Sequence, residues 1–190
     1  MNKIFLFAVV VLSLAGVISA QVAEAGGKAA TIQFPGVSPK QTQQLKTAKL
    51  TTPIVLPTWL PEGFKLSKIE MKLARNVPIY DRFLKIIYER ELSGGGTQRF
   101  ALEAGFDGLG GLPYDATKSL KTQVGTIDLM YEPADEDGNK IKNYAITEWF
   151  SVGKTAFHYM EDYEGEPEQP GRKMLSMADT EKILRSLRRF

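Results

Sequence analysis

Two short glycine-containing segments could contact a nucleotide or its phosphates. Residues 153–155, Gly-Lys-Thr, match the end of a phosphate-binding loop, but Glu148 occupies the position where that loop requires its first glycine. Gly108 and Gly110 suggest a dinucleotide fingerprint, yet its third glycine falls on Pro113. We therefore interpret the first segment as a hairpin turn and the second as loop glycines, and no cofactor is predicted.

The acidic stretch 135–139 has the residue types of a calcium-binding loop, with oxygen ligands at alternating positions beside a glycine. When Gly138 is placed at the sixth position of such a loop, Pro133 falls at the first position and Tyr144 at the twelfth. Both ends then lack the carboxylates that the ion needs, which favours a solvated hairpin tip. A looser calcium site shared with the acidic stretch 161–168 is the alternative; otherwise no metal is predicted.

Acid–base and nucleophilic chemistry have few candidates in this chain. His158 is the single histidine, there is no cysteine, and no nucleophile motif accompanies the histidine. Thiol catalysis and zinc sites built on histidine and cysteine are therefore excluded. Glu89 and Glu91 point to one face of a predicted strand, where two carboxyls could meet a substrate or a cross-strand partner such as Arg99. We predict a non-catalytic protein, with a carboxylate-based hydrolase as an alternative.

Residues 1–25 have the order of an export signal. Lys3 precedes an apolar run over 4–18, and small residues follow it. Cleavage after Ala20 and cleavage after Ala25 both fit, and the A-x-A pattern that ends at Ala25 favours the second. The sequence thus predicts an exported protein of the periplasm or the extracellular space, with no stable membrane span once the signal is cleaved. A retained N-terminal anchor is the alternative.

Composition limits both the fold and the partners of the remaining 165 residues. This length suits one domain with a real core. The formal net charge is +2 with acids and bases interspersed, so neither nucleic acid nor an acidic surface is implied. Without cysteine, the fold must rest on core packing rather than on disulfides, and a lipid-attached cysteine is also excluded.

The segment 26–56 is predicted to be a flexible N-terminal arm or linker, because it is rich in Gly, Gln, Thr, Lys and Pro. Within it, residues 38–41 have the form of a helix start, and a short helix to about Leu50 would need tertiary contacts. Residues 57–190 are predicted to form a single α+β domain.

The domain is predicted to be a twisted antiparallel β-sheet with a C-terminal helix packed on one face. Period-two alternation predicts strands over 64–73, 83–92, 99–106, 144–152 and 155–162, with a bulge or tight turn at Gly125 inside 120–131. The hairpin of 83–92 and 99–106 is predicted to have one wet face. A helix is predicted from Ser176, with an apolar stripe of Thr180, Ile183, Leu184 and Leu187 and with Lys182, Arg185, Arg188 and Arg189 around and after it.

Aromatic residues on adjacent strands are the strongest candidates for a binding surface. Trp149, Phe150, Phe157, Tyr159 and Tyr163 alternate between both sheet faces, and the helix can cover only one of them. The other face either packs against the arm with Trp59 or stays open, and core packing is favoured. The candidate ligand or partner surface consists of Trp59, Trp149, Phe157, Tyr159, Arg185, Arg188 and Arg189.

The order of several short motifs resembles a bacterial family of unknown function. The motifs are Leu60-Pro61-Glu62-Gly63-Phe64 before a strand, Val124-Gly125-Thr126 leading to Tyr131-Glu132, Ile146-Thr147-Glu148-Trp149, and Leu175-Ser176 before Ile183-Leu184-Arg185-Ser186-Leu187. Members of that family resemble extracytoplasmic sensor or accessory domains, often found beyond the membrane segment of anti-sigma-factor proteins. The resemblance covers roughly residues 56–188. This chain departs from it by having no cytoplasmic anti-sigma part, which argues against direct transcriptional regulation.

A more distant likeness, of architecture alone, is to periplasmic domains whose curved sheet holds a helix and can accept lipid or lipoprotein. The leading hypothesis is an exported, non-catalytic accessory or sensor module of the bacterial cell envelope that binds a protein partner through its sheet edge or its basic C-terminal helix. The first alternative is a carrier or sensor of an apolar ligand such as lipid, held between the aromatic sheet and the loop 105–113. The second alternative is the carboxylate-based hydrolase.

Overall fold

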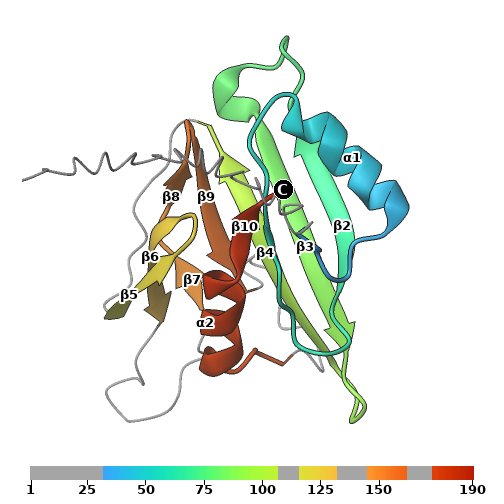
Figure 1. Ribbon diagram of the computed structural model, residues 1–190, viewed down its shortest axis with the longest axis vertical. Coiled ribbons are helices and arrows are strands. Elements are labelled where there is room, and N and C mark those ends of the chain that lie inside the picture. Colours follow the sequence, from blue (N-terminus) through green and yellow to red (C-terminus); the bar gives the residue numbers. More distant parts are fainter. Residues whose placement is uncertain (1–31, 107–115, 132–144, 162–172) are drawn as a thin grey trace, which may run out of the picture. The chain divides into compact units, whose positions relative to one another are not determined.

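The computed structural model describes residues 32–106, 116–131, 145–161 and 173–190, arranged as Figure 1 shows. They form an α+β domain, as predicted. In chain order its elements are α1 (Pro39–Lys49), β1 (Val55–Pro57), β2 (Lys65–Lys72), a 3-10 helix (Ile79–Asp81), β3 (Phe83–Glu91), β4 (Thr97–Gly105), β5 (Ala116–Thr122), β6 (Gly125–Tyr131), β7 (Ile146–Thr147), β8 (Phe150–Val152), β9 (Thr155–Met160), α2 (Met177–Arg185) and β10 (Leu187–Arg189).

The main sheet has the strand order β2-β3-β4-β9-β7-β6-β5, with β8 paired to β9. Its neighbouring strands are antiparallel, as predicted. The β3–β4 hairpin is confirmed, with Glu89 opposite Arg99 in the register. Gly125, with φ of 124°, makes the tight turn between β5 and β6, and Gly153, with φ of 69°, makes the turn between β8 and β9. Glycine suits both turns because other residues rarely adopt a positive φ.

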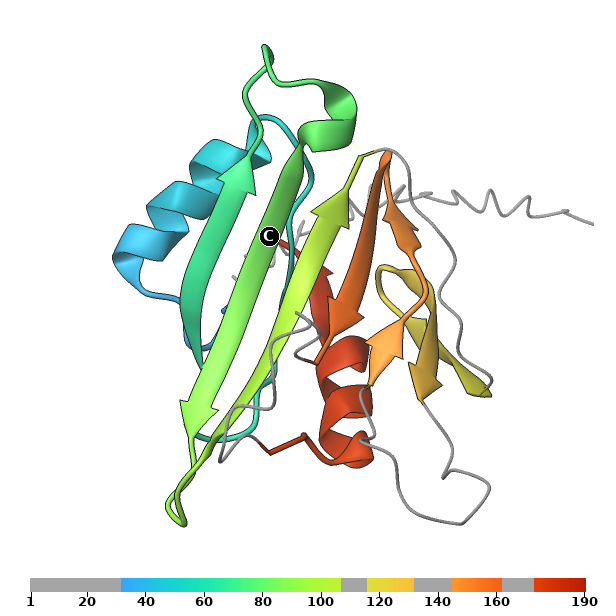
Figure 2. The ribbon, with the colours of Figure 1, turned by 180° about the vertical axis from the view of Figure 1, so that it is seen from behind.

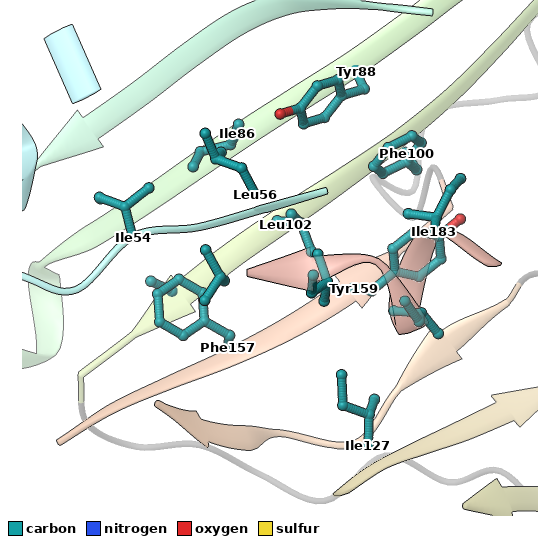
Figure 3. Close-up of a cluster of buried hydrophobic side chains, with 14 of the residues drawn as sticks. Ile54, Leu56, Ile86, Tyr88, Phe100, Leu102, Ile127, Phe157, Tyr159 and Ile183 are labelled. Carbon is teal, nitrogen blue, oxygen red and sulfur yellow. The ribbon is translucent and has the colours of Figure 1, made fainter. Parts of the chain in front are cut away.

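The main hydrophobic core lies on one face of this sheet. Side chains of α1, β1 and α2 belong to the same buried cluster as side chains of β3, β4 and β9, so both helices and the small β1–β10 sheet cover that face. In Figure 1, α2 and β10 lie in front of the sheet, and Figure 2 shows the sheet from the opposite side. The predicted packing of a C-terminal helix on one face is confirmed. Figure 3 shows the centre of the core, including Leu56, Phe100, Phe157, Tyr159 and Ile183.

The segment 26–56, predicted as an arm or linker, is described from Ile32 onward. Its helix α1 follows Ser38 as predicted: the Gln41 N–H donates to Ser38 Oγ at 3.3 Å, and the Ser38 N–H donates to Gln41 Oε1 at 2.9 Å. Leu45 and Ile54 are almost fully buried in the main core. Ile32–Phe190 forms one compact unit, so residues 32–56 pack as part of the domain.

A backbone hydrogen bond at Gly36 links this N-terminal segment to β2 of the main sheet. Its carbonyl oxygen accepts the Leu66 N–H at 2.9 Å, its φ is +74°, and a Cβ there would lie 3.0 Å from the Phe64 carbonyl oxygen. Gly153 has a similar φ of +69°, but no atom lies within 4 Å of its Cβ position. We therefore expect Gly36→Ala to lower the free energy of unfolding by about 2–3 kcal/mol, and Gly153→Ala by about 1 kcal/mol. Equal losses in denaturant unfolding would contradict the close approach at Gly36.

The strand predicted over 144–152 is interrupted in the structure. β7 and β8 are separated by Glu148 and Trp149. The Glu148 N–H still donates to the Asp128 carbonyl of β6 at 2.8 Å, whereas β8 pairs with β9. β7 also pairs with β9, at Ile146 and Met160, and β8 pairs with it at Phe150 and Phe157, so three residues face two between these pairs. The interruption is therefore an irregularity of one extra residue, which a simple alternation of residues does not reveal.

The C-terminal helix ends at Arg185, and the chain continues directly into β10. There Leu187 lies opposite Pro57 and Arg189 opposite Val55, antiparallel to β1. The Ser186 N–H bonds back to the carbonyls of Lys182 and Ile183, which closes the last turn of α2. Arg188 and Arg189 thus lie on a strand rather than on the helix.

The predicted wet face of the β3–β4 hairpin is only partly confirmed. Charged side chains such as Glu89 and Arg99 do lie there half-buried. A second, smaller buried cluster also occupies this outer face, formed by Ile87, Ala101, Met130, Ile146 and Met160. The sheet therefore buries apolar side chains on both faces.

Several predicted features lie outside the described residues. They are the signal segment 1–25, the loop glycines from Gly108 onward, the stretch 135–139 and residues 162–168 of the acidic stretch. In the part of the chain that the structure describes, neither helix is long and apolar enough to cross a membrane.

Candidate functional site

The aromatic candidates from the sequence lie in different environments. Phe157 and Tyr159 are fully buried in the main core. Trp149 is half-buried at the interruption between β7 and β8, and its ring stacks on His158 with 4.0 Å between centroids. Trp59 is half-buried beside α2, where Lys182 Nζ lies 3.9 Å from its ring centroid. Trp59 thus lies beside α2 at the surface, whereas Tyr159 meets α2 inside the core through Thr180 and Glu161.

Cationic residues lie along the end of α2 and along β10, up to the C-terminal residue. We call this set the basic surface, and it consists of Lys49, Lys121, Lys182, Arg185, Arg188 and Arg189. Arg185 Nη1 donates to the Lys121 carbonyl at 3.3 Å, and Arg188 Nη1 donates to the Arg185 carbonyl at 3.1 Å. Lys49 Nζ lies 5.6 Å from the ring centroid of Phe190, which follows β10. The cations therefore follow α2 and β10, with the backbone of Lys121 bonded to Arg185 at one end and Lys49 beside Phe190 at the other.

Hydrogen bonds from Thr58 and Trp59 fix Ser186, which follows the last residue of α2. The Trp59 N–H donates to Ser186 Oγ at 3.2 Å, and Thr58 Oγ1 donates to the Ser186 carbonyl at 2.8 Å. Arg185 and Arg189 are exposed, whereas Arg188 is half-buried. Within the described ranges, no arginine of this surface forms an ion pair. Arg188 Nη1 donates to the carbonyls of Arg185 and Leu187, so the exposed Arg185 and Arg189 are the arginines of this surface that an anionic partner can reach.

A buried carboxyl joins β9 to α2. Glu161 is only 1% exposed, and its Oε1 accepts from Tyr159 Oη at 2.8 Å and from Thr180 Oγ1 at 2.6 Å. Its Oε2 accepts the Leu175 N–H at 3.3 Å. Both carboxyl oxygens therefore already have donors within the protein.

Burial dominates the protonation of this carboxyl. Removal from water raises the pKa of Glu161 from its ordinary value of 4.5 to about 7, although the hydrogen bonds from Thr180, Tyr159 and Leu175 lower it. Burial, together with the nearby Glu161 charge, also raises the pKa of the Tyr159 hydroxyl. A raised carboxyl pKa can mark a general acid, but the hydrogen bonds here also suit a structural link between two elements.

The other carboxylates considered for catalysis lie on the outer face of the sheet. Glu89 lines a shallow depression of about 350 Å³ whose other lining residues are Ser67, Lys68, Ile87 and Arg99. Glu91 is exposed opposite Thr97 and does not line this depression. The structure therefore does not bring the two acids together in one cleft.

His158 is almost fully buried on the same outer face. Its Nε2 lies 3.5 Å from Glu103 Oε2, and its Nδ1 has no hydrogen-bond partner among the described residues. Within the same residues, no group of three or more His, Asp or Glu side chains could hold a metal ion. With a tryptophan stacked on one side and a carboxylate on the other, His158 is held in a fixed orientation.

The sequence analysis did not identify Glu161, Lys49 or Lys121 as candidate site residues. Glu161 continues the period-two series of Phe157 and Tyr159, so alternation places it on the inner face. Alternation alone could therefore have indicated that Glu161 is buried, but the acidic residues that follow it suggest an exposed loop. Lys49 and Lys121 join the basic surface from distant segments, and no local pattern indicates their proximity to Arg185.

Compared with family models, with curated proteins and with solved structures, the chain matches none. The family resemblance based on motif order therefore stays a prediction.

Proposed function

We propose that this protein is an exported, non-catalytic accessory or sensor module of the bacterial cell envelope, and that it binds an acidic segment of a protein partner through the basic surface. The observation that carries the proposal is a succession of cations along the end of α2 and β10, with Lys121 of β5 beside Arg185 at one end and Lys49 of α1 beside Phe190 at the other. The whole chain has a formal net charge of only +2, so this is a local concentration. Such a patch steers and orients an anionic partner.

The side-chain chemistry of the surface supports a protein partner. Arginine binds carboxylates through two parallel hydrogen bonds, and the side chains of Arg185 and Arg189 are exposed to solvent, with only Nη1 of Arg185 donating to the Lys121 carbonyl among the described residues. Trp59, under Lys182, adds an aromatic ring at the edge of the patch. Cations beside an aromatic ring, fixed on ordered elements, are a combination that is common where protein partners bind.

The core gives less support to the two alternatives. Two of the aromatics proposed to line an apolar ligand site pack against other rings: the Tyr159 ring centroid lies 5.2 Å from Phe100, and the Phe157 ring centroid lies 6.2 Å from Phe150. A carboxylate-based hydrolase needs two converging acids. Glu161 is the one nearly fully buried acid in the described part of the chain, and its oxygens bind donors of the protein itself.

Charge reversal on the basic surface tests this proposal. We expect Arg185→Glu combined with Arg189→Glu to weaken the partner complex about tenfold, because two attractive contacts become repulsive. Both side chains are exposed, so the fold should be retained. The measurement is crosslinking in intact cell envelopes, followed by quantification of each crosslinked protein product.

A matched control carries the same change in net charge elsewhere. Lys40 at the start of α1 and Lys65 at the start of β2 are both exposed, and neither belongs to the basic surface. Lys40→Glu combined with Lys65→Glu should leave the crosslinked product unchanged. An equal loss in both double variants, or no loss in the first, would contradict a partner at the basic surface.

A further inference from the structure

Exposed apolar side chains are concentrated in the connection between β2 and β3. Among the described residues, the exposed large hydrophobic residues are Ile32, Leu50, Met71, Ile79, Tyr80 and Phe83. Four of these six lie within residues 71–83, and we call Met71, Ile79, Tyr80 and Phe83 the apolar tip. Ile79 is 51% exposed and Tyr80 is 70% exposed. In Figures 1 and 2 this connection projects beyond one end of the sheet.

The backbone of this connection is well held by its own contacts. Arg82 Nε donates to the Val77 carbonyl and Arg82 Nη2 to the Arg75 carbonyl, both at 2.9 Å. Within it, the Asp81 N–H donates to the Pro78 carbonyl at 3.0 Å. The exposure of Ile79 and Tyr80 is therefore part of an ordered arrangement, and the cost of ordering the loop on binding is already met.

Cations surround the apolar tip. Residues 71–83 contain Lys72, Arg75 and Arg82 but only one acid, Asp81. The last turn of α1 adds two more lysines, and that end of α1 lies at the same end of the sheet as the β2–β3 connection. The exposed side chains of Ile79 and Tyr80 suit the apolar boundary of a membrane surface. The nearby lysine and arginine residues suit its anionic headgroups.

We propose that the apolar tip inserts Ile79 and Tyr80 into the headgroup region of an anionic lipid bilayer. The tip is convex, and a bilayer accepts a convex apolar loop without needing a preformed pocket. Tyr80 suits this depth because its ring is apolar and its hydroxyl is polar. Lys72 Nζ lies 3.7 Å from Asp81 Oδ2 and Arg82 donates to backbone carbonyls, so exposed Arg75 and the two lysines of the last turn of α1 are the cations that hold anionic headgroups. The contact therefore depends on lipid charge and on salt. The contact would place the domain at a membrane without a membrane-spanning helix, and it shares Lys49 but none of the arginines with the basic surface.

A single fluorescent label can test insertion because the chain has no cysteine of its own. Asn76→Cys places an environment-sensitive NBD label beside the tip, while Ser93→Cys places it in the β3–β4 turn; both positions are exposed. Figure 1 shows this turn at the opposite end of the sheet. With vesicles of phosphatidylglycerol and phosphatidylcholine, we expect a blue shift and brighter emission at position 76 only. Vesicles of phosphatidylcholine alone, or high salt, should largely remove the change.

The variant Ile79→Ser combined with Tyr80→Ser should weaken this response at least about tenfold, because insertion of two apolar side chains is lost. Thermal unfolding should be nearly unchanged, since both side chains are exposed. The proposal is overturned if the label at position 76 does not respond, if position 93 responds equally, or if the variant responds like the parent. It is also overturned if position 76 responds to envelope proteins but not to lipid. Since each label reports only its own surroundings, binding through another part of the chain cannot imitate the expected result.

Discussion

Phe100→Ala is expected to lower the free energy of unfolding by about 4 kcal/mol. Deletion of a buried phenylalanine ring leaves a cavity and typically costs 3–5 kcal/mol. Phe100 is fully buried, and its ring centroid lies 5.0 Å from Tyr88, 5.2 Å from Tyr159 and 5.5 Å from Phe64. The substitution therefore removes packing from β3, β4, β9 and the residue before β2 at once. A domain has only about 5–15 kcal/mol of stability in total, so much of it would be lost.

The matched control for this prediction is Phe83→Ala at the start of β3. Phe83 is 36% exposed, so its truncation should cost about 1 kcal/mol or less. Urea unfolding of the parent and both variants gives the two differences directly, provided that the slopes agree. A loss at Phe100 no greater than the loss at Phe83 would show that the aromatic cluster is not the centre of the core.

The stability of the protein is expected to fall as the pH rises from about 4.5 to about 7, because of Glu161. The unfolded chain loses this proton near the ordinary pKa of 4.5, whereas the folded chain keeps it until about pH 7. Between these values the folded state holds the extra proton, so raising the pH favours unfolding. A shift of this size corresponds to about 3 kcal/mol, all of it present below pH 4.5 and lost above pH 7.

Glu161→Gln isolates this effect from other titrating groups. The amide oxygen can still accept from Tyr159 and Thr180, but its NH2 group cannot accept the Leu175 N–H, which costs about 1 kcal/mol at every pH. We therefore expect the variant to be slightly less stable than the parent at pH 4.5 and more stable at pH 8. Unfolding curves measured at both pH values provide the test. Parallel pH profiles of parent and variant would contradict a buried, titrating Glu161.

The local features of this fold could be predicted because short segments specify them. Alternation of apolar residues in 83–92 and 99–106, with glycines between them, indicates the β3–β4 hairpin without reference to the rest of the chain. The reversal of alternation at Gly125 indicates a turn for the same reason. The capping pattern at Ser38 likewise identifies the start of α1.

Contacts between distant segments could not be predicted in this way. β1 and β10 have three residues each, which is too few to show an alternating pattern of apolar residues. Each becomes a strand by pairing with the other. The separation of β7 from β8 depends on one extra residue between the pairs that both strands form with β9, and this pairing becomes visible only in the fold.

The candidate site shows the same limit. Arg185, Arg188 and Arg189 could be named from the sequence, but their union with Lys49 and Lys121 depends on the tertiary fold. The sequence indicated the basic C-terminal helix, but the interspersed charges elsewhere did not indicate which other cations lie near it, because the spacing of charges in sequence says little about their spacing on the folded domain. The apolar tip was missed for a related reason: residues 71–83 show no period, and only the structure reveals that Ile79 and Tyr80 are exposed.

Native mass spectrometry of the protein, released from its own cell envelope without detergent, tests the central claim most directly. The account predicts a complex whose additional mass is that of a protein and which is lost when Arg185 and Arg189 are replaced by glutamate. A reproducible one-to-one adduct of lipid size would contradict it in favour of an apolar-ligand carrier. A bare chain, in a release gentle enough to preserve known envelope complexes, would contradict it as well.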